Sequence, residues 1–146
     1  MQILRAGGAE VSALYVMLKE MHSNTELNVS PIDNYKLLNK INDVVHKGVV
    51  LVSVKDNMIT GSIAGMTTSD WWSSEPFVSD MWFYVTPSYR KSRAAIMLIK
   101  AFIKLAKDAK LKVRLGHIYS GDLDRKDKFY ERLGLVKAGS TYVEKE

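Results

Sequence analysis

The chain has 146 residues and a formal net charge of +5, with 47% hydrophobic and 25% charged residues. These values are typical of one soluble globular domain that has its own core. Because the sequence contains no cysteine, it excludes disulfides, thiolate metal ligands and a thiol nucleophile. Its three histidines (His22, His46 and His117) lack metal-ligand spacing, so no metal site is expected. There is no signal-peptide pattern and no apolar run near the ~20 residues of a membrane span, which predicts a cytoplasmic protein without membrane contact.

The first half of the chain predicts one short strand and two helices. Residues 2–5 are compatible with a strand, and a Gly7-Gly8 break follows. From Ala9, apolar residues recur at helical spacing as far as Ser23-Asn24. Ser30 and Pro31 then mark the start of a second helix that Gly48 ends.

The second half predicts mainly strands, together with two more helices. The predicted strands are residues 49–55, 58–67, 78–85, 112–119 and 135–143, and the predicted helices are residues 91–110 and 122–133. Asp56-Asn57, between the first two of these strands, predicts a hairpin turn. Consecutive strands favour antiparallel pairing, and the β-α-β order near the end favours parallel pairing. The fold class is therefore α/β (α+β): one domain over residues 1–146, in the order β-α-α-β-β-β-α-β-α-β, with a mixed sheet and helices on both faces. Trp71 and Trp72, in a predicted loop, are expected to cover a core edge, with a substrate wall as the alternative.

A short basic turn joins the third long strand to the long helix. It contains Arg90, Lys91, Ser92 and Arg93, which the prediction places in the first turn of that helix. A helix N-terminus presents unpaired N–H groups and the positive end of the helix dipole, and both favour phosphate. The turn therefore predicts a site for an anionic ligand, and a basic helix cap without a ligand is the alternative.

Two segments resemble the Gcn5-related N-acetyltransferase (GNAT) family. In the first, Val85, Pro87, Arg90 and Ala95 match the strand end and the (Arg/Gln)-x-x-Gly-x-(Gly/Ala) pyrophosphate turn of that family, whereas Arg93 stands at the first glycine. The second, residues 129–135 with the sequence FYERLGL, is similar to the family's Leu-Tyr-x-x-x-Gly-Phe signature. Arginine in place of glycine adds bulk and charge, so its side chain has to point outward for the turn to bind phosphate.

The resemblance implies a GNAT fold and an enzyme that transfers the acetyl group of acetyl-CoA directly to a primary amine of an unidentified acceptor. Acetyl-CoA is expected where the sheet opens after residues 78–85. The amine is expected to enter from the other side, between the first two helices and the Trp71-Trp72 loop. The implied cofactor contacts are Phe83, Tyr84 and Val85 on the strand, Arg90, Lys91, Ser92, Arg93, Ala94 and Ala95 in the turn, and Asp122, Lys126 and Phe129 near the following helix.

Two residues are the candidates for proton transfer. The resemblance implies that Tyr130 protonates the departing thiolate of CoA; a core aromatic residue is the alternative. It also places a carboxylate near Asp80 as the general base, and burial would raise the basicity of that carboxylate. Tyr84, a water relay, Glu20 and His22 remain alternative bases, and Asp80 could instead be a structural partner of a cation.

A second hypothesis comes from a different functional class. The helix at 91–110 carries Lys100, Lys104 and Lys107 on one stripe, so the domain could be a non-catalytic GNAT-like module that contacts nucleic acid or an acidic protein. Nucleic acid is not the expected partner, because no stacking aromatics accompany the lysines. The sequence contains no phosphate-loop, dinucleotide-binding or hydrolase-elbow motif. A homodimer is compatible with either hypothesis, and the sequence resembles compact family members encoded by bacteriophages.

Overall fold

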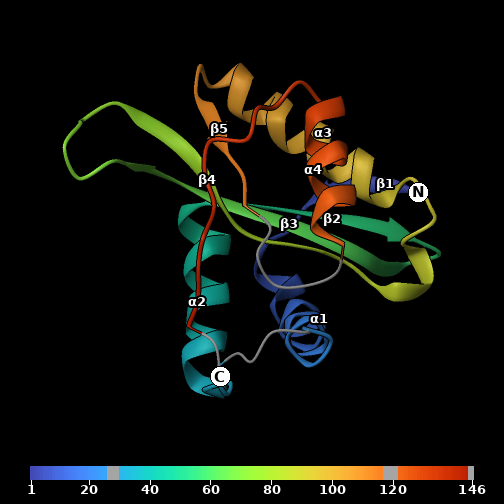
Figure 1. The fold of residues 1–146 in the computed structure, drawn as a ribbon. Coiled ribbons are helices and arrows are strands. Elements are labelled where there is room, and N and C mark those ends of the chain that lie inside the picture. Colours follow the sequence, from blue (N-terminus) through green and yellow to red (C-terminus); the bar gives the residue numbers. More distant parts are fainter. Residues whose placement is uncertain (26–29, 117–121, 145–146) are drawn as a thin grey trace.

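Five strands form one mixed sheet in the computed structural model, which describes residues 1–25, 30–116 and 122–144. The strands are β1 (Gln2–Arg5), β2 (Val49–Lys55), β3 (Met58–Ser69), β4 (Pro76–Val85) and β5 (Lys112–Arg114), and they lie side by side in chain order. The first four pair antiparallel, and β5 pairs parallel to β4 (Figure 1). The mixed pairing predicted from the order of the elements is confirmed.

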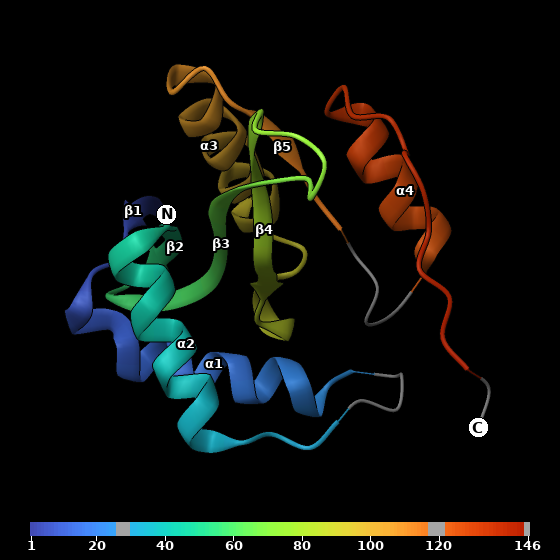
Figure 2. The same cartoon turned by 90° about the vertical axis from the view of Figure 1, so that its left-hand side faces the viewer.

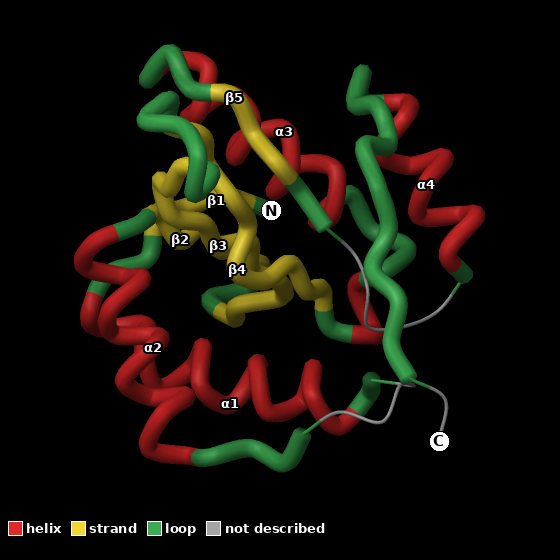
Figure 3. Tube along the Cα trace, turned by 60° about the vertical axis from the view of Figure 1, so that its left-hand side comes forward, coloured by secondary structure: helices red, strands yellow, loops and turns green. Residues whose placement is uncertain are grey.

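Helices cover both faces of this sheet (Figure 3). On one face lie α1 (Val11–Ser23) and α2 (Asn34–Lys47), and on the other lie α3 (Ala94–Asp108) and α4 (Leu123–Arg132). Each face has its own apolar cluster. Leu14, Ile41 and Trp82 belong to the first cluster, and Ile63 and Phe102 belong to the second. No helix among the described residues is both long and apolar enough to cross a membrane.

Local interactions and backbone angles explain where α2 begins and how β2 turns into β3. Asp33 caps α2 by accepting a hydrogen bond from the N–H of Lys36 at 3.0 Å, so this helix begins after the predicted Ser30-Pro31 signal. The predicted hairpin turn between β2 and β3 is confirmed. Asp56 and Asn57 have φ of 52° and 61°, the left-handed pair that a tight two-residue hairpin requires.

The predicted last strand, residues 135–143, is not formed. The segment continues from α4 toward the C-terminus without joining the sheet (Figure 2), and Val136 and Tyr142 are 89% and 91% exposed. A strand needs an edge to pair with and a core to cover, and an alternating apolar pattern supplies neither. The predicted strand at 112–119 is also shorter: β5 ends at Arg114, and residues 117–119 lie outside the described residues.

Candidate active site

β4 and β5 diverge at Asp80. Their ladder ends with the pair Ser79 and Arg114, and the N–H of Gly116 then faces both carboxylate oxygens of Asp80 at 3.2 Å. Among the described residues, no strand pairs with residues 81–85 on this side, although β3 pairs along the other. Alternate N–H and C=O groups of an unpaired strand edge point outward. This edge can therefore pair with an extended ligand that contains amide groups.

A β-bulge at Met81 determines which β4 side chains face each layer of helices. Two consecutive β3 residues pair with Trp82 and Asp80, which leaves Met81 as the extra residue. Side chains alternate between the faces of a regular strand, and an extra residue reverses that alternation. Trp82 consequently packs toward α1 and α2, whereas Val78 packs toward α3. Asp80, two residues after Val78 and before the bulge, lies on the α3 and α4 face.

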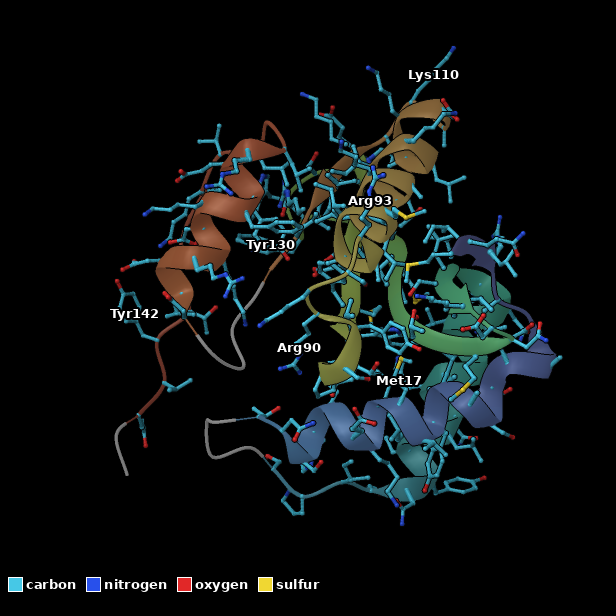
Figure 4. All side chains as sticks on the ribbon, turned by 90° about the vertical axis from the view of Figure 1, so that its right-hand side faces the viewer. Met17, Arg90, Arg93, Lys110, Tyr130 and Tyr142 are labelled. Atoms are coloured by element: carbon cyan, nitrogen blue, oxygen red, sulfur yellow. The ribbon has the colours of Figure 1, made fainter. Side chains whose placement is uncertain are left out.

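The two predicted catalytic residues lie close together on this face. Tyr130 of α4 packs against the second apolar cluster, and its ring meets Phe129 edge-on with centroids 5.6 Å apart. Figure 4 shows Tyr130 pointing from α4 toward α3 and the sheet. Burial, and then the negative charge of Asp80, raise the pKa of Tyr130. The phenol therefore keeps its proton at neutral pH beside a carboxylate.

Residues 86–93 form a turn that precedes α3, not the first turn of the helix as predicted. A short 3-10 helix, Pro87–Tyr89, is followed by Ser92, whose hydroxyl accepts a hydrogen bond from the N–H of Ala94 at 3.2 Å and so delays the start of the helix. Within the described part of the chain, no acceptor bonds the N–H groups of Lys91 and Arg93. Two backbone donors next to the positive end of a long helix are the features that bind phosphate.

The two arginines of this turn differ in their surroundings. Arg90 donates from Nε to the carbonyl of Val85 at 3.2 Å, and its guanidinium carbon lies 5.5 Å from the ring centroid of Tyr84. It therefore lies against the end of β4, where Figure 4 labels it, with further N–H donors available. Arg93 has φ of −83° and ψ of 2°, a right-handed conformation that tolerates a side chain. Glycine is not required at this position.

The opposite face of β4 carries a separate polar cluster. The hydroxyl of Tyr84 donates to Oε1 of Glu20 at 2.8 Å and accepts from Nδ2 of Asn24 at 3.1 Å, so α1 is tied to β4. Burial and the bond to the Glu20 carboxylate raise the pKa of Tyr84. His22 is occupied elsewhere, because its Nε2 lies 2.8 Å from the carbonyl oxygen of Ser30. Tyr84 therefore contacts α1 on the opposite face of β4, whereas the charge of Asp80 acts on Tyr130.

The remaining predicted cofactor residues divide into two groups. Lys126, Phe129 and Tyr130 are spaced i, i+3 and i+4 on α4, which places them on one face of the helix. Asp122 caps α4 by accepting from the N–H of Arg125 at 3.1 Å. At the start of α3, Ala94 is buried in the core and Ala95 is partly buried. Phe83 is partly buried on the face that α3 covers.

Trp71 and Trp72 do not cover a core edge, contrary to the prediction. They are 92% and 67% exposed and contact each other, with ring centroids 5.3 Å apart. The reason is the length of the β3–β4 hairpin, which extends beyond the helices in Figure 1 and so has no core beneath its tip. Asp70, the first residue of the loop that joins β3 and β4, forms two 2.7 Å contacts with the guanidinium of Arg114, which ties the start of the loop to β5.

Sequence patterns missed Asn24, Gly116 and the bulge at Met81. Gly116 acts through its backbone N–H, and any residue other than proline supplies that group, so its identity gives no signal. Asn24 and Tyr84 are 60 residues apart, and nothing local connects them. A bulge has a weak sequence signature; the only hint was Gly65 opposite it, where a Cβ would lie 2.5 Å from Cζ of Phe102.

Comparison with solved structures shows the same architecture over almost the whole chain. A possible acetyltransferase from Clostridium difficile 630 gives a TM-score of 0.77 at 16% identity, covering 99% of this chain and 96% of that one. A predicted acetyltransferase from Clostridium acetobutylicum, solved with acetyl-CoA, gives a TM-score of 0.77 at 15% identity. The match covers 99% of this chain and 95% of that one. An aminoglycoside antibiotic 6'-N-acetyltransferase from Acinetobacter haemolyticus gives a TM-score of 0.74 at 16% identity. The match covers 100% of this chain and 99% of that one. At these identities the similarity establishes the fold. No curated protein matches the sequence.

The five-stranded mixed sheet with helices on both faces is the fold of these solved acetyltransferases. The model of the acetyltransferase (GNAT) family matches residues 13–135, which is most of the chain. The chain belongs to the GNAT acetyltransferase family, as its two C-terminal motifs predicted.

Proposed function

We propose that this protein is an acetyl-CoA-dependent N-acetyltransferase, with one catalytic domain over residues 1–146, that transfers the acetyl group directly to a primary amine. The observation that carries the proposal is that Asp80 and Tyr130 share the α3 and α4 face where β4 and β5 diverge, where the charge of Asp80 acts on Tyr130. A carboxylate and a protonated phenol at one end of an open strand edge form a proton acceptor and a proton donor, the two groups that amide formation from a thioester requires.

The residues present fit acetyl-CoA. The unpaired edge of residues 81–85 offers backbone groups to the two amides of pantetheine. The free N–H groups of Lys91 and Arg93, next to the positive end of α3, suit the pyrophosphate. The side chains of Arg90 and Lys91 add positive charge to the same turn. A ligand that lay along this path would bring its thioester close to Tyr130.

The proposed step balances its protons within the protein. The thioester supplies an activated acyl group, and the amine nitrogen forms the new C–N bond as the C–S bond breaks. Asp80 takes the proton that the amine loses, and Tyr130 gives its phenolic proton to the departing sulfur. Return of the proton from the carboxyl to the phenolate, directly or through water, then restores both groups.

The raised pKa of Tyr130 is compatible with this role. An ordinary phenol has a pKa of about 10 and a free thiol about 8.5, so proton transfer to a thiolate is slightly uphill. Burial and the charge of Asp80 raise the pKa of the phenol further. Both would also raise the pKa of a thiol at the same place. The difference in pKa between the Tyr130 phenol and the CoA thiol therefore changes less than the pKa of the phenol alone.

The experiment is a thiol-release assay with acetyl-CoA and a panel of primary amines that contains polyamines, aminoglycosides and lysine peptides. Because the chain has no cysteine, the protein adds no thiol of its own to the signal. Tyr130→Phe removes only the hydroxyl and should lower turnover by roughly 10²–10⁴-fold, as for a general acid, with unchanged affinity for acetyl-CoA. Turnover of Tyr130→Phe close to that of the wild type would contradict the assignment of the acid.

A further inference from the structure

A basic groove lies between α3 and α4, on the lysine-rich face of α3. Its volume is about 410 Å³, and it is lined by Lys100, Ile103, Lys104, Lys107, Arg132 and Leu133. The α3 residues are spaced i, i+3, i+4 and i+7, so they form one continuous face of that helix. The α4 side contributes Arg132 and Leu133, and cations from two elements therefore converge on one depression.

The charge of the groove is largely uncompensated. Lys104 forms an ion pair with Asp108 at 2.9 Å, but both side chains are more than half exposed. Over the part of the chain that the structure describes, no carboxylate forms an ion pair with Lys100, Lys107 or Arg132. Like charges held together destabilise a folded protein unless a partner of opposite charge occupies the space.

The floor of the groove is aliphatic. Ile103 and Leu133 are partly buried and pack against the second apolar cluster, which leaves their remaining surface at the bottom of the depression. Among the described residues that line it, none is an aromatic side chain on which a base could stack. A polypeptide that carries carboxylates and an aliphatic side chain matches both features.

We propose that the groove between α3 and α4 binds an acidic polypeptide segment, whose carboxylates face the lysines and Arg132 and whose aliphatic side chain rests on Ile103 and Leu133. The groove lies further along α3 than the proposed cofactor turn: its first lining residue, Lys100, is seven residues along the chain from Arg93, about 10 Å of helix. Peptide binding in the groove therefore does not require acetyl transfer.

The test measures binding of a fluorescein-labelled peptide of alternating glutamate and leucine by fluorescence anisotropy. The double variant Lys107→Glu/Arg132→Glu reverses two exposed charges of the groove. Its matched control, Lys36→Glu/Lys40→Glu, makes the same change in net charge on α2. We expect the groove variant to bind roughly tenfold more weakly or worse, a loss of about 1.4 kcal/mol, and the control to bind like the wild type.

Three further comparisons complete the experiment. A peptide with serine in place of leucine should bind more weakly, because it cannot use the aliphatic floor. Equal weakening by both double variants would overturn the proposal, since net charge alone would then explain binding. A labelled single-stranded oligonucleotide that bound the groove more tightly than the peptide would also overturn it, in favour of nucleic acid. Unchanged melting temperature and acetyl-CoA affinity in the groove variant would show that any loss is local.

Discussion

Asp80 combines a structural contact with a candidate chemical role. Its carboxylate accepts from the N–H of Gly116, which fixes the point at which β5 leaves β4, and its charge acts on Tyr130. Asp80 lies two residues after Val78 and before the bulge at Met81, so it shares the face of Val78, which α3 covers. The Asp80 side chain thus contributes both to the divergence of β4 and β5 and to the proposed proton transfer.

The Asp80→Asn variant separates these two roles. The amide oxygen of asparagine can still accept from Gly116, so we expect the fold and the affinity for acetyl-CoA to persist. Turnover should fall by roughly 10²–10⁴-fold, because the amide is not a base. Steady-state kinetics and urea denaturation measure both effects. If turnover persisted while the free energy of unfolding dropped, Asp80 would be structural only.

Titration of Tyr130 should also make the free energy of unfolding depend on pH in the alkaline range. Its pKa is raised in the folded protein above the ordinary value of 10.0, so the unfolded chain loses this proton first as the pH rises. The stability contributed by the neutral phenol is fully present below that ordinary value and is lost as the pH rises through the folded pKa.

The comparison is between the wild type and Tyr130→Phe, in urea denaturation from about pH 8 to about pH 11. The free energy of unfolding should decline more steeply with pH in the wild type, because Tyr130→Phe lacks the titrating group and the other tyrosines are common to both proteins. Parallel declines would mean that Tyr130 is not buried beside a negative charge.

At the scale of elements, the turn before α3 replaces a glycine by an arginine without backbone strain. Arg93 has right-handed backbone angles, so the position needs no glycine for its conformation, and the side chain adds a charge. Arg93→Gly should therefore bind acetyl-CoA comparably or somewhat more weakly, with a smaller dependence of affinity on salt. Calorimetry at low and high sodium chloride measures this. Markedly tighter binding by Arg93→Gly would show that the arginine obstructs the turn.

Elements with strong local patterns were predictable from the sequence. The hairpin turn at Asp56-Asn57 and the motif around Tyr130 each depend on residues close together in the chain. The parallel pairing of β4 with β5 follows from the order strand, helix, strand. The segment at 135–143 has a similar alternating pattern, yet no edge pairs with it among the described residues, and it forms no strand. Whether a strand forms depends on a partner that its own sequence does not encode.

The candidate site was predictable only in part for the same reason. Tyr130, Arg90 and the turn were identified through motifs, whereas the polar cluster of Tyr84, Glu20 and Asn24 joins residues about 60 positions apart. The exposed Trp71 and Trp72 were misplaced because the sequence does not encode how far a hairpin extends beyond its helices. Local chemistry could be predicted, and long-range geometry could not.

On the scale of the whole molecule, the sheet separates two layers of helices, and the proposed catalytic residues lie on only one side of it. The α1 and α2 face holds an apolar cluster and the polar cluster of Tyr84, Glu20 and Asn24, and the α3 and α4 face holds the proposed catalytic residues and the basic groove. A ligand that contacts β4, the turn and α4 binds the folded protein and not the unfolded chain. Acetyl-CoA at about 100 times its dissociation constant should therefore stabilise the folded protein by roughly 2.7 kcal/mol.

Isothermal titration calorimetry of acetyl-CoA tests the central claim most directly, with wild type, Arg90→Ala and the control Lys36→Ala compared at one salt concentration. The account predicts one site per chain in the wild type, a loss of roughly 1–3 kcal/mol in Arg90→Ala, as for a removed charged hydrogen bond, and no change in Lys36→Ala. Absence of binding by the wild type would contradict the proposed cofactor. Wild-type affinity in Arg90→Ala would contradict the assignment of the turn to its phosphates.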